Sequence, residues 1–365
     1  MEQKIKVLQV FTQMGRGGAE TMIMNYYRQL DKQKYQFDFL VHRKQRCDYD
    51  NEIEQIGGTI FRAFPIRPWN YFLYFKFLDS FFREHAEQYT AVHAHIQENS
   101  GIVLKYAAKY GIKNRVCTSH IANLGIDYKY PFRLYGKTYN KYITKRLACG
   151  KEAGKYLYGN KDFEVFPNAI NLIDFKYNFK QNIAFRENHK WMGKFIVGNV
   201  ARFCYQKNHT FLIDIFNEIY KLNKNAILVL VGEGELKPYI MNKVISLNLS
   251  EVVYFEGLKT NINDYMNVFD VFLLPSLFEG LPVVAIEAQA AGIKSFLSDT
   301  IDIQTDITGD ITFISLNYTA FQWANCILSN VPYVKKNNYI PMKLAGYDVK
   351  TNVDKLVKLY TDKIY

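Results

Sequence analysis

Short apolar runs alternate with helical patterns along this chain, and the alternation occurs in two series. In the first series, apolar runs of strand length cover residues 4–11, 37–41, 59–64, 91–95, 115–119 and 146–149. In the second series, they cover residues 195–200, 226–231, 252–256, 268–274 and 294–297. Strands that alternate with helices form parallel sheets covered on both faces. The sequence therefore predicts an α/β fold of two doubly wound, Rossmann-like domains.

A polar stretch, residues 171–190, separates the two series. We expect an N-terminal domain over residues 1–185 and a C-terminal domain over residues 192–345. Apolar residues at helical spacing in 349–364 predict a terminal helix, so residues 346–365 are assigned to a helix that returns toward the N-terminal domain. Ligands of doubly wound sheets bind at the carboxyl ends of the strands, so we expect the site in the cleft between the domains.

Composition narrows the class of protein. No window reaches the ~18 uncharged apolar residues of a membrane span, and the chain enters a strand directly after its first residues, so we expect no signal peptide. The five cysteines are scattered and none has C-x-x-C spacing, which is typical of free thiols in a reducing cytoplasm. Residues 1–190 hold 30 Lys and Arg against 18 Asp and Glu, whereas residues 191–365 hold 16 against 17. The basic first half indicates an anionic partner, a lipid head group or a nucleic acid, or else only a soluble basic face.

The stretch from Phe278 to Glu287 contains the residues that most clearly indicate ligand binding. An apolar strand ends at Pro275, a loop with Glu279 and Gly280 follows, and residues 283–291 have a helical composition. The start of a helix is a seat for an anion, because its backbone N–H groups are unpaired. A second carboxylate, Glu287, lies about two turns along on roughly the same face. A phosphate seat beside two carboxylates that can bind hydroxyls suits a sugar nucleotide.

Two cations follow the first strand of the second series. Arg202 offers a planar fork for phosphate oxygens and Lys207 a point charge, so together they can hold a diphosphate. An isolated pair of this kind is more often two exposed surface cations. Because the chain also contains the Glu279 loop, we favour phosphate binding.

The first loop, Gly15-Arg16-Gly17-Gly18, is not a dinucleotide fingerprint, because the third glycine of G-x-G-x-x-G falls on Glu20. Its alternatives are a tight turn and a loop whose backbone approaches a ligand. The loop follows a strand end, which favours ligand contact.

Three histidines and one acidic pair are candidate catalytic or metal-binding groups. His93 and His95 resemble a metal pair without an evident third ligand, so we expect no metal. His120 follows a strand end, and a catalytic role and a buried, hydrogen-bonded role are both open. Asp48 and Asp50 form a D-x-D, a pair that holds a divalent metal on the donor diphosphate in single-sheet glycosyltransferases. Because they follow a basic strand end and precede a helix, solvated acids or helix-start residues are favoured instead.

Bases are mixed with aromatic residues in two stretches, 62–83 and 127–146. Such mixtures suit a membrane interface, the stacking of nucleic-acid bases, or helices that face a core. We favour interfacial membrane contact for the second stretch.

Taken in order, six motifs resemble glycosyltransferase family 4, a family of the GT-B fold that serves bacterial capsule and exopolysaccharide assembly. The resemblance covers nearly the whole chain, and the motifs are residues 15–20, 166–171, 199–202, 207–208, 231–234 and 278–287. The chain departs from the family at Ala169, where glycine is common, and at Gly150, where serine is common.

The resemblance implies a retaining glycosyltransferase (hexosyltransferase type) that moves a sugar from a nucleotide-sugar donor, with UDP favoured, to a lipid-linked glycan acceptor. It implies no metal or other cofactor, no nucleic-acid partner, and a cytoplasmic protein peripheral on the inner face of the membrane. The resemblance implies that Arg202 and Lys207 bind the donor diphosphate and that Gly17 and Gly18 close over it. It implies that Glu279 contacts hydroxyls of the donor sugar, that the backbone of Gly280 and Leu281 approaches the sugar and phosphate, and that Pro282 belongs to the donor-binding loop. It also implies that Glu287 holds the ribose hydroxyls and that His120 lies near the reacting centre, so Glu279 and His120 are the candidate catalytic residues.

Two alternatives stay open at this point. One is another GT-B enzyme, such as a nucleotide-sugar 2-epimerase. The other is a non-catalytic nucleotide-sugar or nucleic-acid binding protein, although the presence of both cations and both acids argues against a dead relative.

Overall fold

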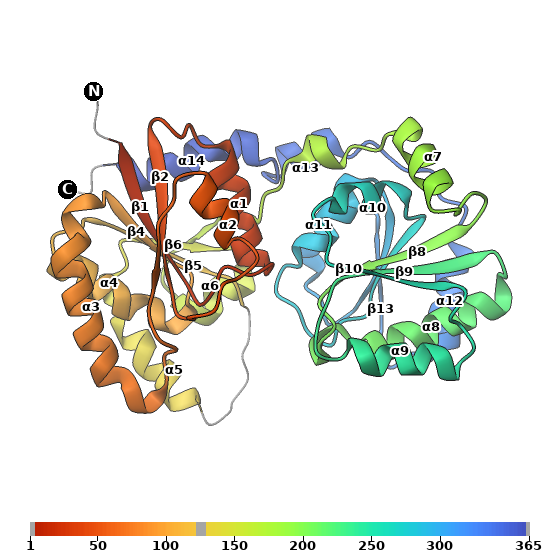
Figure 1. Cartoon of the computed structure of the whole chain (residues 1–365), viewed down its shortest axis with the longest axis horizontal. Helices are drawn as coiled ribbons and strands as arrows, with labels where there is room; N and C mark the ends of the chain where they lie inside the picture. The colour runs from red at the N-terminus through yellow and green to blue at the C-terminus, as the bar shows by residue number, and fades with distance from the viewer. Residues whose placement is uncertain (1–3, 122–128, 363–365) are drawn as a thin grey trace. The chain divides into compact units, whose positions relative to one another are not determined.

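A computed structural model of the chain describes residues 4–121 and 129–362. The chain forms two compact units, one of Met1–Ala169 with Val349–Tyr365 and the other of Ile170–Asp348. Each unit is built on its own parallel sheet (Figure 1). The expected α/β fold with two doubly wound sheets is confirmed.

The sheet of the first unit has the strand order β3-β2-β1-β4-β5-β6-β7, and all its described pairings are parallel. Its strands are β1 (Ile5–Phe11), β2 (Tyr35–Val41), β3 (Ile60–Arg62), β4 (Ala91–Ala94), β5 (Asn114–Ser119), β6 (Lys145–Ala148) and β7 (Glu164–Val165). Its helices are α1 (Gly18–Gln29), α2 (Asp50–Gln55), α3 (Tyr71–His85), α4 (Ser100–Lys109), α5 (Tyr130–Lys137), α6 (Lys151–Tyr158) and α14 (Val349–Thr361). The order reverses between β1 and β4, which is where such sheets bind ligands.

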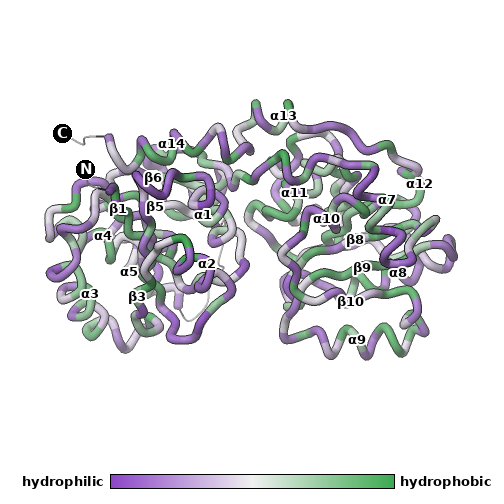
Figure 2. Tube along the Cα trace, turned by 45° about the horizontal axis from the view of Figure 1, so that its top comes forward, coloured by the Kyte–Doolittle hydropathy of each residue, from purple (hydrophilic) through white to green (hydrophobic). Residues whose placement is uncertain are grey.

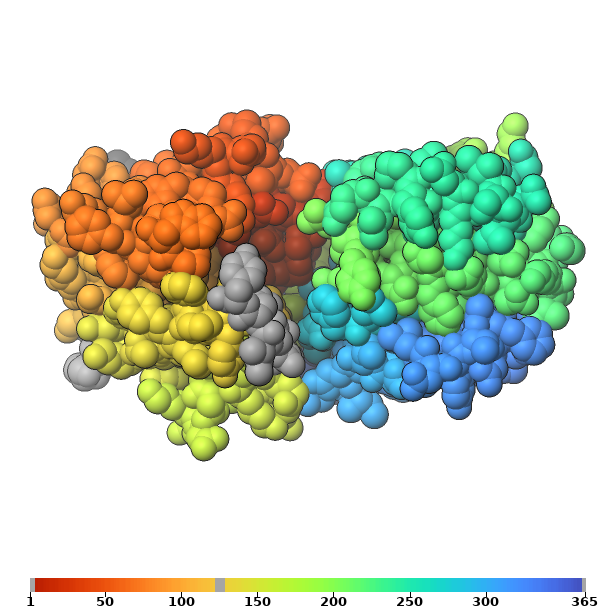
Figure 3. All heavy atoms as spheres, turned by 90° about the horizontal axis from the view of Figure 1, so that it is seen from below, coloured from red at the N-terminus to blue at the C-terminus, as the bar shows by residue number. Residues whose placement is uncertain are grey.

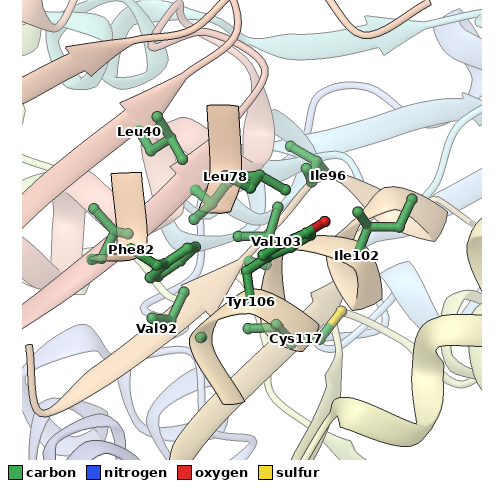
Figure 4. Packing of buried hydrophobic residues seen from close by; sticks show 14 of the residues in the cluster. Leu40, Leu78, Phe82, Val92, Ile96, Ile102, Val103, Tyr106 and Cys117 are labelled. Atoms are coloured by element: carbon green, nitrogen blue, oxygen red, sulfur yellow. The ribbon is translucent and has the colours of Figure 1, made fainter. Parts of the chain in front are cut away.

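Alternate residues of each central strand enter two different cores. On one face, Leu8 and Val92 pack with Leu78 and Phe82 of α3 and with Val103 of α4 (Figure 4). On the other face lie α1, α2 and α14, which cover the alternate strand residues Val7, Phe37, Ala91 and Val116. A strand whose side chains are buried on both faces has no surface side, which explains why these strands carry few charged residues.

The last described helix, α14, completes the second of these cores. Val349, Leu356 and Tyr360 are buried within it, beside α1 and β5. The helix was expected over residues 349–364; it ends at Thr361, and residues 363–365 lie outside the described residues.

The sheet of the second unit has the order β10-β9-β8-β11-β12-β13, again with parallel pairings. Its strands are β8 (Phe195–Val200), β9 (Ala226–Val231), β10 (Val253–Gly257), β11 (Val271–Leu274), β12 (Lys294–Ser298) and β13 (Ile311–Ile314). Its helices are α7 (Phe179–Asn188), α8 (His209–Leu222), α9 (Lys237–Ser246), α10 (Ile262–Val268), α11 (Val283–Ala290), α12 (Ala320–Ser329) and α13 (Tyr339–Leu344). All residues of β9 are buried, and the strand is hydrophobic throughout (Figure 2).

The boundary between the units differs from the expected one. The first unit ends at Ala169 rather than at residue 185, because the intervening segment packs within the second unit. Helix α7 lies in the stretch interpreted as a polar separator. The Asn182 side chain donates to Asn267 O at 2.7 Å, and the Asn267 side chain donates to Asn178 O at 3.0 Å. These bonds tie α7 to the end of α10.

One strand is shorter than expected. The apolar run 268–274 contains the last residue of α10, Val268, and β11 begins only at Val271. Between them, Asp270 accepts hydrogen bonds from the Ile196 N–H and from the guanidinium of Arg186, each at 2.7 Å. A buried helix end and a buried strand are equally apolar, so hydrophobicity alone does not separate them.

We expect α14 to be necessary for the stability of the first unit. Leu356→Ala removes a side chain that is 1% exposed in its core and should cost about 2–5 kcal/mol of unfolding free energy. Hydrogen exchange of β1 and β2 amides measures the loss in the first unit. The exposed neighbour Lys355→Ala is the control, and equal protection in the two variants would contradict the prediction.

Candidate active site

Two loops meet in the second unit where its strand order reverses. β8 and β11 are neighbours in the sheet, and their carboxyl ends lead into the 3-10 turn η6 (Tyr205–Lys207) and into the Glu279 loop. The two loops are hydrogen-bonded to each other: the Leu277 N–H donates to Gln206 O at 2.8 Å, and Gln206 Nε2 donates to Phe278 O at 2.9 Å. The first loop therefore holds the second in place.

Lys207 and Glu279 form an ion pair between these loops. Lys207 Nζ contacts Glu279 Oε1, and Gln206 Nε2 donates to the other carboxylate oxygen, Oε2, at 3.0 Å. The side chains are only 17% and 7% exposed, respectively. An ammonium has three N–H donors and each carboxylate oxygen accepts more than one bond, so the pair retains capacity for a ligand. It presents a positive and a negative group side by side.

Arg202 does not join this pair. It follows β8 as expected, but its Nη2 lies 2.9 Å from Glu235 Oε2, and the two side chains are 67% and 55% exposed. Solvent screens an exposed ion pair of this kind, so redirecting the guanidinium toward a phosphate costs little.

Helix α11 begins directly after the Glu279 loop. Pro282 is its N-cap, and Gly280 and Leu281 are half-buried in the loop before it, so the N-terminal end of the helix faces this loop. Glu287 lies farther along α11, and its carboxyl has no hydrogen bond or ion pair to any described residue, although its backbone carbonyl accepts from the Ala291 N–H. Burial raises the pKa of its carboxyl to about 8. Glu287 is thus an unpaired acid that a pair of ligand hydroxyls could satisfy.

In the first unit, the glycine loop leads into α1. Gly17 is the N-cap and Gly18 the first helical residue, and both are exposed. A Cβ on Gly17 would lie 2.3 Å from Glu20 Oε2, so the Glu20 carboxylate folds back over the glycine. Burial raises the pKa of Glu20 to about 7.

His120 stands just beyond the end of β5, as expected. Its Nε2 lies 2.9 Å from Nδ1 of His95, and its own Nδ1 is buried with no hydrogen-bond partner among the described residues. Burial lowers the pKa of His120 to about 4, so the imidazole is neutral at pH 7.

The remaining candidate histidines and Asp50 have partners within the protein. His93 and His95 are buried in hydrogen bonds to protein groups, and burial lowers the pKa of both well below the usual value. Asp50 begins α2, and its Oδ2 lies 2.5 Å from Arg62 Nη2. Over residues 4–121 and 129–362, no group of three or more His, Cys, Asp or Glu side chains is arranged to hold a metal ion.

Comparison with known proteins gives the family. The family model for Glycosyltransferase Family 4 matches residues 16–172, and that for Glycosyl transferases group 1 matches residues 180–311. The chain is 36% identical to the putative glycosyltransferase EpsF of Bacillus subtilis (strain 168), over 97% of this chain and 96% of that protein. The chain belongs to glycosyltransferase family 4.

More distant relatives agree with this assignment. This glycosyltransferase is 28% identical to the capsular polysaccharide biosynthesis glycosyltransferase CapH of Staphylococcus aureus, over 78% of each chain. It is 25% identical to the UDP-Gal:alpha-D-GlcNAc-diphosphoundecaprenol alpha-1,3-galactosyltransferase of Escherichia coli, over 76% of each chain. Among solved structures, Anabaena Alr3699/HepE in complex with UDP and glucose superposes with a TM-score of 0.76 at 16% identity, over 98% of this chain and 100% of that chain. The fold is GT-B.

Two features of the glycosyltransferase site were missing from the sequence interpretation. Gln206 binds Glu279, although only its neighbour Lys207 was assigned a role. Its position in the turn that follows β8 was the available signal. The second feature is the pair of hydrogen bonds of His95 with Gln9 and His120. These bonds join residues on or just after separate strands, so no local sequence pattern predicts them.

The raised pKa of Glu287 should make stability depend on pH. The folded state holds this proton more tightly than the unfolded state, so the stabilisation is complete below about pH 4.5 and is lost as the pH rises through about 8. Glu287→Gln, which cannot ionise, should gain unfolding free energy relative to the parent protein by up to about 1.4 kcal/mol per pH unit in this window.

Urea unfolding at pH 5, 6, 7 and 8 measures this difference. The exposed carboxyl variant Glu251→Gln is the control. Parallel pH curves for Glu287→Gln and the parent protein would contradict the prediction.

Proposed function

We propose that this glycosyltransferase transfers a hexose, with retention of anomeric configuration, from a UDP-sugar to a lipid-linked glycan during synthesis of a capsule or exopolysaccharide. It acts in the cytoplasm, as a peripheral protein on the inner face of the cell membrane. The observation that carries the proposal is the Lys207–Glu279 pair, held by Gln206 at the point where the strand order of the second sheet reverses.

The pair matches two chemically different groups of a nucleotide-sugar, the anionic diphosphate and the hydroxyls of the sugar. Lys207 binds the donor diphosphate, and Arg202 leaves Glu235 to join it. Glu279 accepts hydrogen bonds from hydroxyls of the donor sugar. The backbone of Gly280, Leu281 and Pro282 lies against the sugar and phosphate at the start of α11, where helix N–H groups favour an anion.

The remaining site residues contact the ribose, the diphosphate and the region of the reacting carbon. Glu287 accepts the ribose hydroxyls, which replace the missing partners of its carboxyl. Gly17 and Gly18 bind the diphosphate through their backbone. His120 lies near the reacting carbon and binds the substrate through Nδ1.

The reaction proposed is front-face displacement. The bond from the anomeric carbon to the leaving phosphate breaks as the bond to the acceptor oxygen forms on the same face, and the acceptor proton passes to the leaving phosphate. Charge develops on that phosphate, so fixed positive groups aimed at it lower the barrier. Lys207, Arg202 and the α11 N-terminus supply these groups, and the proposed reaction requires no metal or other cofactor.

The relatives support the choice of substrates. The HepE structure holds UDP and glucose, and the name of the Escherichia coli relative specifies a UDP-sugar and a diphosphoundecaprenol-linked acceptor. The name of CapH specifies capsular polysaccharide biosynthesis.

An aromatic surface of the first unit supports membrane contact. Trp69, Phe72 and Leu73 are 80%, 67% and 59% exposed, and Lys76 Nζ lies 4.4 Å from the centre of the Phe72 ring. The Tyr71 ring contacts Phe132 and Tyr135 of α5, so the two basic aromatic stretches join on one face (Figure 3). Of the second stretch, residues 127 and 128 lie outside the described residues, and no helix within the described residues is long and apolar enough to cross a bilayer.

Transfer of the sugar should depend on the three charged residues of the second unit that are proposed to bind the donor sugar and its diphosphate. Glu279→Ala, Lys207→Ala and Arg202→Ala should each lower kcat by roughly 10²–10³-fold, the usual loss when one group that stabilises the transition state is removed. A thermal-shift screen of UDP-sugars selects the donor, and UDP release with an undecaprenyl diphosphate-linked sugar measures turnover. Lys180→Ala removes an exposed cation of the same unit as a control. Unchanged turnover in all three variants would sink the assignment.

Membrane binding should depend on the aromatic surface. The double change Trp69→Ala/Phe72→Ala should lower the partition onto phosphatidylglycerol vesicles at low salt by at least about tenfold, because burial of each large aromatic side chain contributes about 1.5–3 kcal/mol. Vesicle flotation measures the bound fraction. Phe321→Ala, which removes an aromatic residue 52% exposed in the second unit, is the control. Equal flotation of the two variants excludes this surface as the contact.

A further inference from the structure

A chain of polar side chains crosses the interior of the first sheet. The central strands β1, β4 and β5 place polar residues at the same level of the face that α14 covers, where Gln9 is paired with His93 in the sheet register. The chain consists of Gln9, His93, His95, Thr118, His120 and Tyr360. Buried polar groups are costly without partners, so their mutual bonds are a condition for burying them.

Tyr360 of α14 is the branch point of this polar chain. Gln9 Nε2 donates to the Tyr360 hydroxyl oxygen at 3.2 Å, and this hydroxyl lies 2.8 Å from His93 Nδ1. Tyr360 is 1% exposed and Gln9 is fully buried. The hydroxyl accepts from Gln9, and its own proton goes to His93, whose Nε2 then donates to Thr118 Oγ1 at 2.7 Å.

The orientation of the Gln9 amide determines the proton positions in the other branch. With Nε2 of Gln9 directed to Tyr360, its Oε1 faces His95 Nε2 at 3.1 Å and can only accept. His95 Nε2 therefore carries the proton, and its Nδ1 is an acceptor. His120 Nε2, 2.9 Å away, must then donate, which leaves the lone pair of His120 on Nδ1.

The polar chain ends at Nδ1 of His120, which has no hydrogen-bond partner among the described residues. Burying an acceptor without a partner is unfavourable, and no other side-chain nitrogen or oxygen of the polar chain is buried without a partner among the described residues. The polar chain thus runs from the final helix to one unsatisfied nitrogen of His120.

We propose that Tyr360 is a positioning residue, whose hydroxyl orients the Gln9 amide and thereby holds His120 in the tautomer with an open Nδ1 lone pair for the substrate. Helix α14 then influences the reaction through His120 and also packs in the core of the first unit. The catalytic consequence rests on the role of His120 in the proposed function, but the tautomer itself does not.

Tyr360→Phe tests the proposal directly. Without the hydroxyl, the Gln9 amide loses its acceptor and can turn over, which places its NH₂ against His95 and reverses both imidazoles. We expect His120 to change from one tautomer to a mixture of two. Long-range ¹H–¹⁵N NMR of histidine-labelled protein measures the tautomers, and the His120→Gln spectrum assigns the signal.

Kinetics give the second readout. With the UDP-sugar selected by the thermal-shift screen, Tyr360→Phe should lower kcat about tenfold and leave the KM of the donor within a factor of about two, since proton placement at His120 changes and the Lys207–Glu279 pair does not. Gln9→Leu should give the same pattern.

Tyr158→Phe is the matched control. Its hydroxyl is buried in the same unit and donates to Cys117 O at 2.7 Å and to Leu147 O at 2.8 Å, outside the polar chain. It should lower stability without changing the His120 signal or kcat. An unchanged His120 tautomer in Tyr360→Phe overturns the proposal, as does a loss of kcat no larger than in Tyr158→Phe. Because NMR needs no substrate, failure of the proposed reaction is distinguishable from failure of the tautomer assignment.

Discussion

Both sheets are buried on both faces, so a polar side chain on a central strand must find its partner inside the protein. This constraint determines which polar side chains can occupy the central strands of both units and which partners they contact. In the second sheet, Asn199 Nδ2 donates to Leu273 O at 2.8 Å and ties β8 to β11 just before the two loops of the site. Beyond these strand ends, Gln206 satisfies Glu279. The requirement that positions the buried amides also positions the groups proposed to bind substrate.

The strands were largely predictable because short, fully apolar runs such as Ala226–Val231 recur between helical patterns, as in a sheet buried on both faces. The run 268–274 shows the limit, since the end of α10 is as apolar as β11. Helix α7 was not predictable, because its apolar residues do not gather on one face and asparagine hydrogen bonds to α10 hold it in place. These bonds join residues far apart in sequence. For the same reason, the boundary between the units could not be read from the polar composition of residues 171–190.

The candidate site was predictable where strand ends determine it. Lys207 and Glu279 follow neighbouring strands, and their ion pair results from the order of those strands. The partner of Arg202 was not predictable, because an exposed side chain takes a rotamer set by whichever acid lies within reach. The bond between Gln9 and Tyr360 joins residues 351 positions apart, and only the packing of α14 on the sheet brings them together. The neighbours of Asp50 allowed a solvated acid or a helix-start residue. The structure places Asp50 at the start of α2, where it is buried and paired with Arg62.

The position of α14 has a consequence for biosynthesis. Residues up to Ala169 leave the ribosome first, but the core that holds Phe37 and Val116 lacks one wall until Val349, Leu356 and Tyr360 have been translated. The first unit thus finishes folding last, after the entire second unit has been synthesised. A nascent or truncated chain that lacks α14 exposes apolar surface, the feature by which chaperones and proteases recognise incomplete proteins. Formation of the complete first core therefore requires that the second unit has already been translated.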